Sequence, residues 1–180
     1  MPPLLFFTDP ARTPDPEAVL RRLPRGAGVV FRAFGAADAA AQGTRLRRIA
    51  WRRGLTLLAG ADPALAAAIR ADGVHLPERG AARATRLRRM RPGWIVTVAA
   101  HSLRAAIGAR RAGADAVVVS PVFPSRSPSA GKPLGPLRLA ILVRAAGCPV
   151  YALGGIDAVR AQRIARIGVA GFAAVEALTR

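Results

Sequence analysis

The sequence is poor in cysteine and contains no long apolar run. The single cysteine, Cys148, excludes an intramolecular disulfide, and we expect it to be a structural thiol. No apolar run reaches the roughly 18 residues that a membrane-spanning helix requires. The chain also enters an apolar segment at once, without a basic targeting region. We therefore expect a cytoplasmic protein with no membrane partner and no thiol redox chemistry.

Acidic residues are scarce as well, because 10 Asp and Glu face 28 Lys and Arg, which gives a formal net charge of +18. The excess is nearly all arginine, with Lys132 the lone lysine, and no aromatic side chains interleave with the arginines. Such a surface attracts anions but lacks the stacking platform that single-stranded nucleic acids need. We expect small phosphorylated substrates and no specific nucleic-acid partner.

Aromatic residues make up only 5% of the 180 residues, so a core must be built mainly from aliphatic side chains. Apolar segments typical of buried strands alternate with helical segments. We predict strands over residues 4–8, 29–34, 56–59, 73–76, 94–99, 116–120, 150–153 and 171–175. We predict helices over residues 14–22, 37–53, 63–70, 81–90, 102–112, 134–146 and 158–167. This series predicts a single domain, residues 1–180, of the α/β class and the (β/α)8 barrel type.

An open doubly wound sheet is the competing topology, because typical barrels are longer, at about 250 residues. The first predicted strand lacks the glycine-rich turn of a dinucleotide site, and the close strand spacing suits a minimal barrel. Only residues 176–180 follow the last predicted strand. We therefore predict a compact barrel with a shortened C-terminal helix, closed by a short turn or a neighbouring subunit, and we expect a homodimer.

Two predicted strands end in loops that suit a ligand, since α/β folds bind ligands at the carboxyl ends of parallel strands. The sixth predicted strand leads into Ser120 and a polar, proline-rich loop. The seventh leads into Gly154 and Gly155, whose missing Cβ lets backbone N–H groups approach a phosphate. The sequence therefore predicts a phosphate site at this edge of the sheet.

Several short phrases carry a family resemblance. They are FTD at 7–9, ADGVHL at 71–76, HS at 101–102, GAD at 113–115, SPVFP at 120–124, PLG at 133–135, LGGI at 153–156 and GVAGFAAV at 168–175. With these phrases the chain resembles the thiamine phosphate synthase family and the related TenI group over essentially its whole length. The resemblance implies a transferase of thiamine biosynthesis that couples hydroxymethylpyrimidine diphosphate to thiazole phosphate and releases diphosphate with help from Mg²⁺.

For the thiazole phosphate, the resemblance implies four binding residues. Ser125 and Ser127 stand where the family usually has two threonines, and Gly154 and Gly155 match the family directly. The lysine that follows the threonines in the family is a proline here. Lys132, a few residues further on, is the expected substitute.

For the diphosphate, the family places Gln, Arg and Lys at alternate positions of its second strand. This chain keeps only the arginine, Arg32, between Val30 and Phe34. Burying a guanidinium in a barrel strand is costly without an anion, so we expect Arg32 to bind an anion and to act in catalysis.

Mg²⁺ binds through carboxylate oxygens. The family's Asn-Asp pair after the third strand aligns with Gly60 and Ala61, and its second metal-binding aspartate falls on Gly80. Asp62 and Glu78 are the remaining candidate metal ligands, the latter through a rearranged loop.

His75 and His101 end the fourth and fifth predicted strands, so we expect both at the barrel mouth, as general acids or bases or as loop-holding hydrogen-bond partners. In TenI relatives a histidine after the sixth strand is the acid and base, and here that position is Pro121. Three interpretations stay open. They are a divergent thiamine phosphate synthase, a metal-free TenI-like enzyme acting on a thiazole or other small phosphate, and a non-catalytic phosphate-binding relative.

Overall fold

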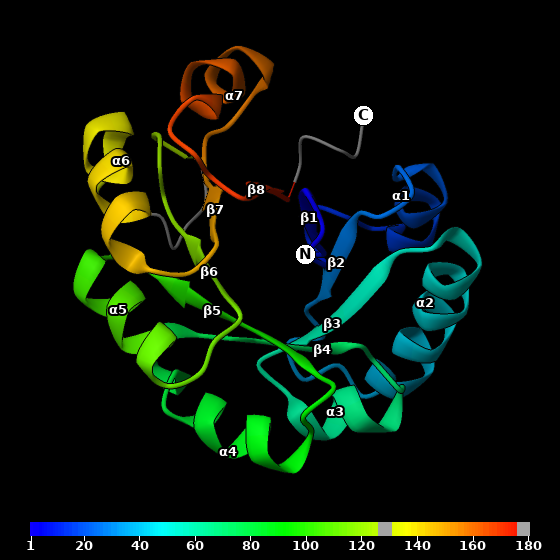
Figure 1. Ribbon diagram of the computed structural model, residues 1–180. Helices are drawn as coiled ribbons and strands as arrows, with labels where there is room; N and C mark the ends of the chain where they lie inside the picture. Colours follow the sequence, from blue (N-terminus) through cyan, green and yellow to red (C-terminus); the bar gives the residue numbers. More distant parts are fainter. Residues whose placement is uncertain (126–130, 176–180) are drawn as a thin grey trace.

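The computed structural model describes residues 1–125 and 131–175, which form a closed barrel of parallel strands paired in chain order (Figure 1). The strands are β1 (Leu4–Phe7), β2 (Gly28–Phe31), β3 (Thr56–Gly60), β4 (Gly73–Leu76), β5 (Ile95–Ala100), β6 (Ala116–Val119), β7 (Val150–Leu153) and β8 (Gly171–Ala174). The outer helices are α1 (Pro16–Arg22), α2 (Ala39–Arg53), α3 (Pro63–Ala68), α4 (Arg83–Met90), α5 (Leu103–Arg111), α6 (Gly135–Ala146) and α7 (Ala158–Ala165), with a 3₁₀ turn, η1 (Glu78–Gly80), after β4. The predicted (β/α)8 barrel is confirmed.

The barrel closes within one chain, because β8 pairs with β1 and places Ala173 opposite Leu5. Closure therefore does not require a strand from a neighbouring subunit, which was one of the two routes expected from the sequence. The expected shortened C-terminal helix falls on residues 176–180, outside the described residues. None of the described helices is long and apolar enough to cross a membrane.

Strand side chains divide between two apolar cores, since successive residues of a strand point to opposite faces. Outward-pointing residues such as Phe6, Val29 and Leu57 are completely buried beneath the helices. Inward-pointing residues fill the barrel; they are Leu5, Phe7, Val30, Leu58, Ala116, Val118, Tyr151 and Ala173. The Tyr151 hydroxyl donates to the Pro2 carbonyl, and burial raises the pKa of Tyr151 to about 12. A filled interior leaves the carboxyl-end mouth as the place for a ligand.

Strand β2 ends at Phe31, earlier than the sequence predicted, so Arg32 lies in the loop that follows rather than in the strand. The reason lies in the backbone a few residues on. Phe34 has a φ of 49° and Gly35 a φ of 79°, both in the left-handed region that an extended strand cannot contain. The early end carries Arg32 to the mouth of the barrel.

Four helices begin where an acidic or hydroxyl side chain accepts a hydrogen bond from the first turn, as N-cap residues do. These caps are Asp15 for α1, Asp62 for α3, Ser102 for α5 and Asp157 for α7. Each cap follows a loop at the mouth, so the caps fix where those loops end.

We predict that Gly73→Ala destabilises the barrel, because a Cβ at this position would lie 1.9 Å from the Ile95 carbonyl oxygen of the paired strand. The strands would have to separate, and the free energy of unfolding should fall by roughly 2 kcal/mol or more. Gly93→Ala is the matched control, since no atom lies within 4 Å of its added Cβ. Urea unfolding of both variants checks the difference, and equal stabilities would contradict the close approach.

Candidate active site

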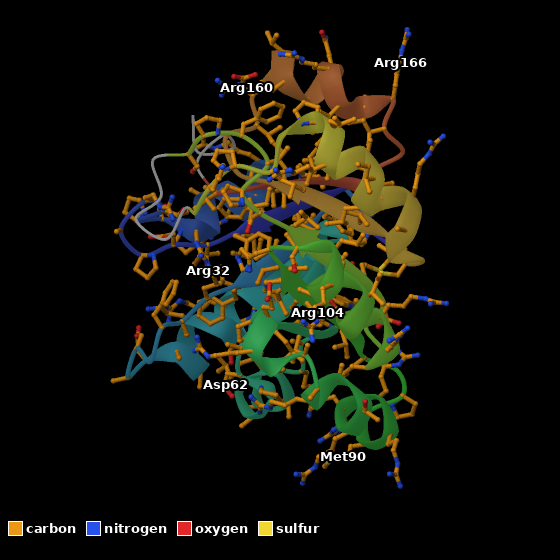
Figure 2. All side chains as sticks on the ribbon, turned by 90° about the vertical axis from the view of Figure 1, so that its left-hand side faces the viewer. Arg32, Asp62, Met90, Arg104, Arg160 and Arg166 are labelled. Atoms are coloured by element: carbon orange, nitrogen blue, oxygen red, sulfur yellow. The ribbon has the colours of Figure 1, made fainter. Side chains whose placement is uncertain are left out.

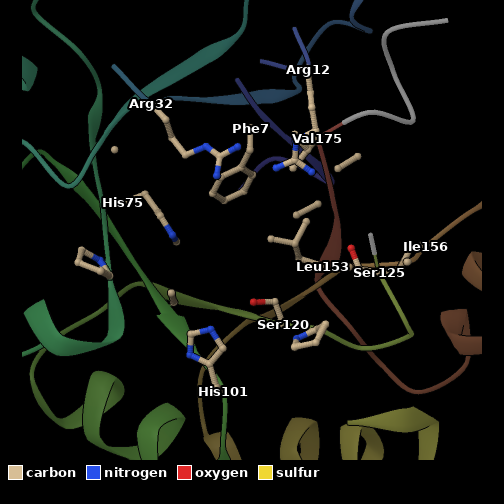
Figure 3. Close-up of a pocket in the computed structure, with 18 of the residues that line it drawn as sticks. Phe7, Arg12, Arg32, His75, His101, Ser120, Ser125, Leu153, Ile156 and Val175 are labelled. Atoms are coloured by element: carbon tan, nitrogen blue, oxygen red, sulfur yellow. The ribbon is translucent and has the colours of Figure 1, made fainter. Parts of the chain in front are cut away.

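A pocket of about 1170 Å³ opens at the carboxyl ends of the strands (Figure 3). Figure 3 shows Arg12 and Arg32 on one side of it, His101 on the side away from them, and Ser125 and Ile156 at a third position. Loops from both ends of the chain thus meet around one space, as parallel closure requires. This pocket is large enough for two small substrates.

Arg32 is held at this mouth by several groups of β1 and the loop after it. Its Nε donates to the Thr8 carbonyl over 2.7 Å, and Nη2 lies 3.1 Å from Asp9 Oδ2. Its guanidinium carbon also lies 5.7 Å from the ring centre of Phe7 and 5.1 Å from that of Phe34, within the range of a cation–π contact. Asp9 thus compensates part of this charge within the protein. Binding of an anionic ligand by Arg32, expected from the sequence, stays a prediction.

Asp9 also binds Arg12, over 2.8 Å, so one carboxylate holds two guanidinium groups beside the pocket. Burial acts to raise the pKa of Asp9, but the hydrogen bond from Arg12 and the charges of both arginines outweigh it and hold that pKa below its usual value. Both guanidinium groups line the pocket, so this side of the mouth presents N–H donors suited to an anion.

Gly60, which aligns with the family's asparagine, packs closely against Arg32. A Cβ at residue 60 would lie 3.0 Å from Arg32 Cγ and 3.1 Å from the Phe31 carbonyl oxygen. The next residue, Ala61, has a φ of 62°, a strained value for a residue with a Cβ. The asparagine expected at position 60 would not fit this arrangement without a shift of Arg32.

The turn from β7 into α7 forms a backbone cradle. Gly154 and Gly155 have φ values of 97° and 63°, and a Cβ on Gly155 would lie 2.3 Å from the Pro124 carbonyl oxygen. Within the described part of the chain, the N–H groups of Gly155 and Ile156 have no hydrogen-bond acceptor. Unpaired N–H groups at the start of a helix are suited to bind a phosphate.

The loop after β6 runs alongside this cradle and brings Ser125 to the pocket. The Val122 N–H donates to the Leu153 carbonyl over 2.9 Å, and the Phe123 N–H donates to the Gly154 carbonyl over 3.0 Å. Ser127, the other expected hydroxyl, lies outside the described residues. The β6 and β7 loops therefore form one connected wall.

Lys132, the expected substitute for the family lysine, is exposed and is not among the described residues that line the pocket. Its role in phosphate binding stays a prediction. Arg160, on the first turn of α7, does line the pocket beside the cradle. Arg160 could not be singled out from the sequence, because it is one of many arginines on predicted helices.

His75 lies deeper, with only 8% of its surface exposed. Its Nδ1 is 2.9 Å from Thr97 Oγ1, and its ring meets Phe7 edge-on with ring centres 5.0 Å apart. Burial, with a smaller contribution from Arg32, lowers the pKa of His75 to about 3. His75 is therefore neutral near pH 7, and its ring contacts Thr97 and Phe7.

His101 sits at the rim and is paired with Glu78. Glu78 Oε2 accepts the His101 backbone N–H over 2.7 Å and lies 2.8 Å from the ring Nδ1. This contact leaves Nε2 of a half-exposed imidazole for a ligand. Glu78, one of the two candidate metal ligands, is thus in contact with His101.

The described residues do not fit a dedicated Mg²⁺ site. Asp62 lines the pocket, but its Oδ1 accepts the Leu65 N–H over 2.9 Å as the cap of α3. Glu78 is held by His101, and Asp9 by two arginines. Across residues 1–125 and 131–175, no three His, Cys, Asp or Glu side chains come together as metal ligands would. The expected pair of Asp62 and Glu78 is thus engaged in other contacts.

A family model described as thiamine monophosphate synthase matches residues 4–178. Among curated proteins, the chain is 37% identical over 111 residues to "Putative thiamine-phosphate synthase 2" of Aquifex aeolicus, covering 62% of this chain and 59% of that protein. It is 32% identical over 148 residues to a thiamine-phosphate synthase of Geobacillus kaustophilus, covering 81% of this chain and 66% of that protein.

Among solved structures, a thiamine phosphate pyrophosphorylase from Pyrococcus furiosus superposes with a TM-score of 0.86 at 25% identity, over 98% of this chain and 87% of that chain. The matched region spans only about six-tenths of the length of the first curated relatives, at 59% and 63%. The structural match is therefore more complete than the sequence matches.

We predict that His75 makes the protein less stable in acid. Its folded pKa of about 3 lies below the unfolded value of about 6.5, so between these values the unfolded chain binds the extra proton and stability falls as the pH falls. The contribution reaches at most about 1.4 kcal/mol per pH unit. Denaturant unfolding from pH 7 to pH 4 should give a shallower decline for His75→Gln. Equal slopes for the two proteins would contradict a neutral, buried His75.

We predict that Asp62 stabilises α3 as a cap and not as a metal ligand. Asp62→Ala should lower the free energy of unfolding by about 1 kcal/mol, equally in millimolar Mg²⁺ and in chelator. Asp38→Ala is the control, because Asp38 precedes α2 without a side-chain cap bond and should cost less. A loss for Asp62→Ala that appears only with Mg²⁺ would restore the metal assignment.

Proposed function

The chain belongs to the thiamine monophosphate synthase family, and we propose that its barrel mouth joins hydroxymethylpyrimidine diphosphate to thiazole phosphate in thiamine biosynthesis. The observation that carries the proposal is the cradle after β7, where two N–H groups without an acceptor among the described residues border the pocket. They would bind the phosphate of the thiazole and fix the position of its ring.

The other side of the pocket suits the diphosphate. As the pyrimidine carbon loses diphosphate, negative charge grows on the leaving oxygens while the thiazole nitrogen approaches that carbon. Arg12 and Arg32 border the pocket there, pre-oriented by Asp9. Because the described carboxylates do not form a metal site, we assign stabilisation of the leaving group to these guanidinium groups. Arg32 is the proposed catalytic residue.

A metal-free enzyme acting on a thiazole or another small phosphate is the second candidate function. The observation that favours it is the pair of His101 and Glu78 at the rim, since a histidine oriented by a carboxylate is a common general acid or base. His101 would then transfer a proton on a phosphate-anchored substrate, in place of the histidine that Pro121 replaces. A cytoplasmic location and a homodimer remain predictions, as does the absence of a specific nucleic-acid partner.

We predict that purified protein forms thiamine phosphate from the two substrates and that Arg32→Ala lowers kcat/KM at least about 100-fold, because a donor to the leaving oxygens is lost. Product is followed by fluorescence after oxidation. Arg104→Ala is the control, since Arg104 is exposed on α5 away from the pocket. Melting temperatures of both variants show whether the fold is intact.

The same assay is run with Mg²⁺ and with chelator. Product that survives chelation would support charge stabilisation by arginine, and product lost with chelator would show that Mg²⁺ enters with the diphosphate. No product under either condition, while thiazole phosphate still binds, would reject the coupling reaction and leave the second candidate or a binding protein.

A further inference from the structure

The phosphate cradle needs a positive charge that the family's lysine does not supply here. Backbone N–H groups alone bind a dianion less strongly than they do together with a cation. The described arginines that line the pocket are Arg12, Arg32, Arg79 and Arg160. The first two contact Asp9 and the third lies in η1. Arg160, on the first turn of α7, contacts the cradle itself through the Gly155 carbonyl.

Arg160 is positioned over the cradle by its two neighbouring loops. Its Nη1 donates to the Gly155 carbonyl over 2.9 Å and lies 3.4 Å from Asp157 Oδ2. Its guanidinium carbon lies 5.5 Å from the ring centre of Phe123, in the loop after β6. The side chain is 45% exposed, so a ligand in the pocket can reach it. Figure 2 shows Arg160 near the start of α7, in contrast to Arg166, which projects away from the far end of that helix.

These contacts leave donors for a ligand. A guanidinium has five N–H donors in a planar fork, and among the described residues the hydrogen bond to Gly155 and the ion pair with Asp157 both involve Nη1 of Arg160. The same Gly155 whose carbonyl accepts from Arg160 has an N–H without an acceptor among the described residues. A phosphate at the cradle would therefore meet the N–H groups of Gly155 and Ile156 and the fork of Arg160 together.

We propose that Arg160 binds the phosphate of thiazole phosphate, in place of the family's lysine, and makes the site selective for the phosphorylated thiazole over its unphosphorylated alcohol. The ligand's identity rests on the proposed function; the position of the cation does not. Hydrogen bonds to a charged group are strong enough that losing them weakens binding roughly ten- to a hundredfold. The alcohol carries no such charge, so its binding should change little when Arg160 is replaced.

A purely structural role for Arg160 would give a different result. If Arg160 only joined the loops after β6 and β7, its replacement would weaken binding of the phosphorylated and of the unphosphorylated thiazole by similar factors. It would also lower the melting temperature of the protein. The ratio of the two dissociation constants therefore separates a phosphate ligand from a loop clamp.

The experiment measures binding of thiazole phosphate and of the thiazole alcohol by calorimetry, without turnover. The proteins are the unaltered chain, Arg160→Gln, Arg160→Lys and the matched control Arg163→Gln, whose exposed arginine lies on the same helix outside the pocket. We expect Arg160→Gln to weaken the binding of thiazole phosphate at least about tenfold and the binding of the alcohol less than about twofold. Arg160→Lys should recover part of the loss, and Arg163→Gln should match the unaltered chain.

Each result decides the proposal. An unchanged ratio in Arg160→Gln, or an equal loss in Arg163→Gln, overturns it. Failure of the unaltered chain to prefer the phosphorylated thiazole also overturns it. A preference that depends on Arg160 supports it even where the coupling assay yields no product, so failure of the coupling reaction and failure of this proposal are distinguishable.

Discussion

Parallel closure of the barrel is the constraint on which the site depends. Because β8 pairs with β1 in the same sense as every other pair, all eight carboxyl ends face one mouth. Residues as distant in sequence as Arg12 and Arg160 therefore border one pocket. The interior below is filled by side chains such as Phe7 and Tyr151, so the chemistry is confined to the loops.

The described carboxylates at this mouth are all engaged with cations or N–H groups of the protein. Asp9 holds two guanidinium groups, Glu78 holds His101, and Asp62 and Asp157 cap helices. A carboxylate already engaged with cations or N–H groups is a poor ligand for Mg²⁺, which prefers several free oxygens. Arg12, Arg32, Arg79 and Arg160 still line the pocket, so guanidinium donors are available to phosphorylated substrates.

Sequence alone predicted the barrel because its signals are repeated. Each apolar strand is followed by a helical segment, and two of the predicted strands, 73–76 and 150–153, coincide with β4 and β7. Local pattern failed where tertiary contacts decide, as at Arg32, which a left-handed backbone at Phe34 moves out of β2. The partners Asp9 and Thr97 and the position of Arg160 could not be predicted either, since each depends on loops or strands meeting across the mouth.

The two halves of the pocket have departed from the family pattern in different ways. On the proposed diphosphate side the packing is close, because a Cβ at residue 60 would lie 3.0 Å from Arg32 Cγ and 3.1 Å from the Phe31 carbonyl oxygen. A larger residue at this position would require a small shift of the Arg32 side chain. On the proposed thiazole side both glycines match the family, and a Cβ at Gly155 would meet the Pro124 carbonyl oxygen. The cationic side chain beside the cradle is Arg160, which comes from helix α7 and not from the loop after β6. Close backbone contacts restrict the glycine positions of such a phosphate site, so they tolerate little substitution. The position of a cationic side chain is less restricted, because a different helix or loop can supply it.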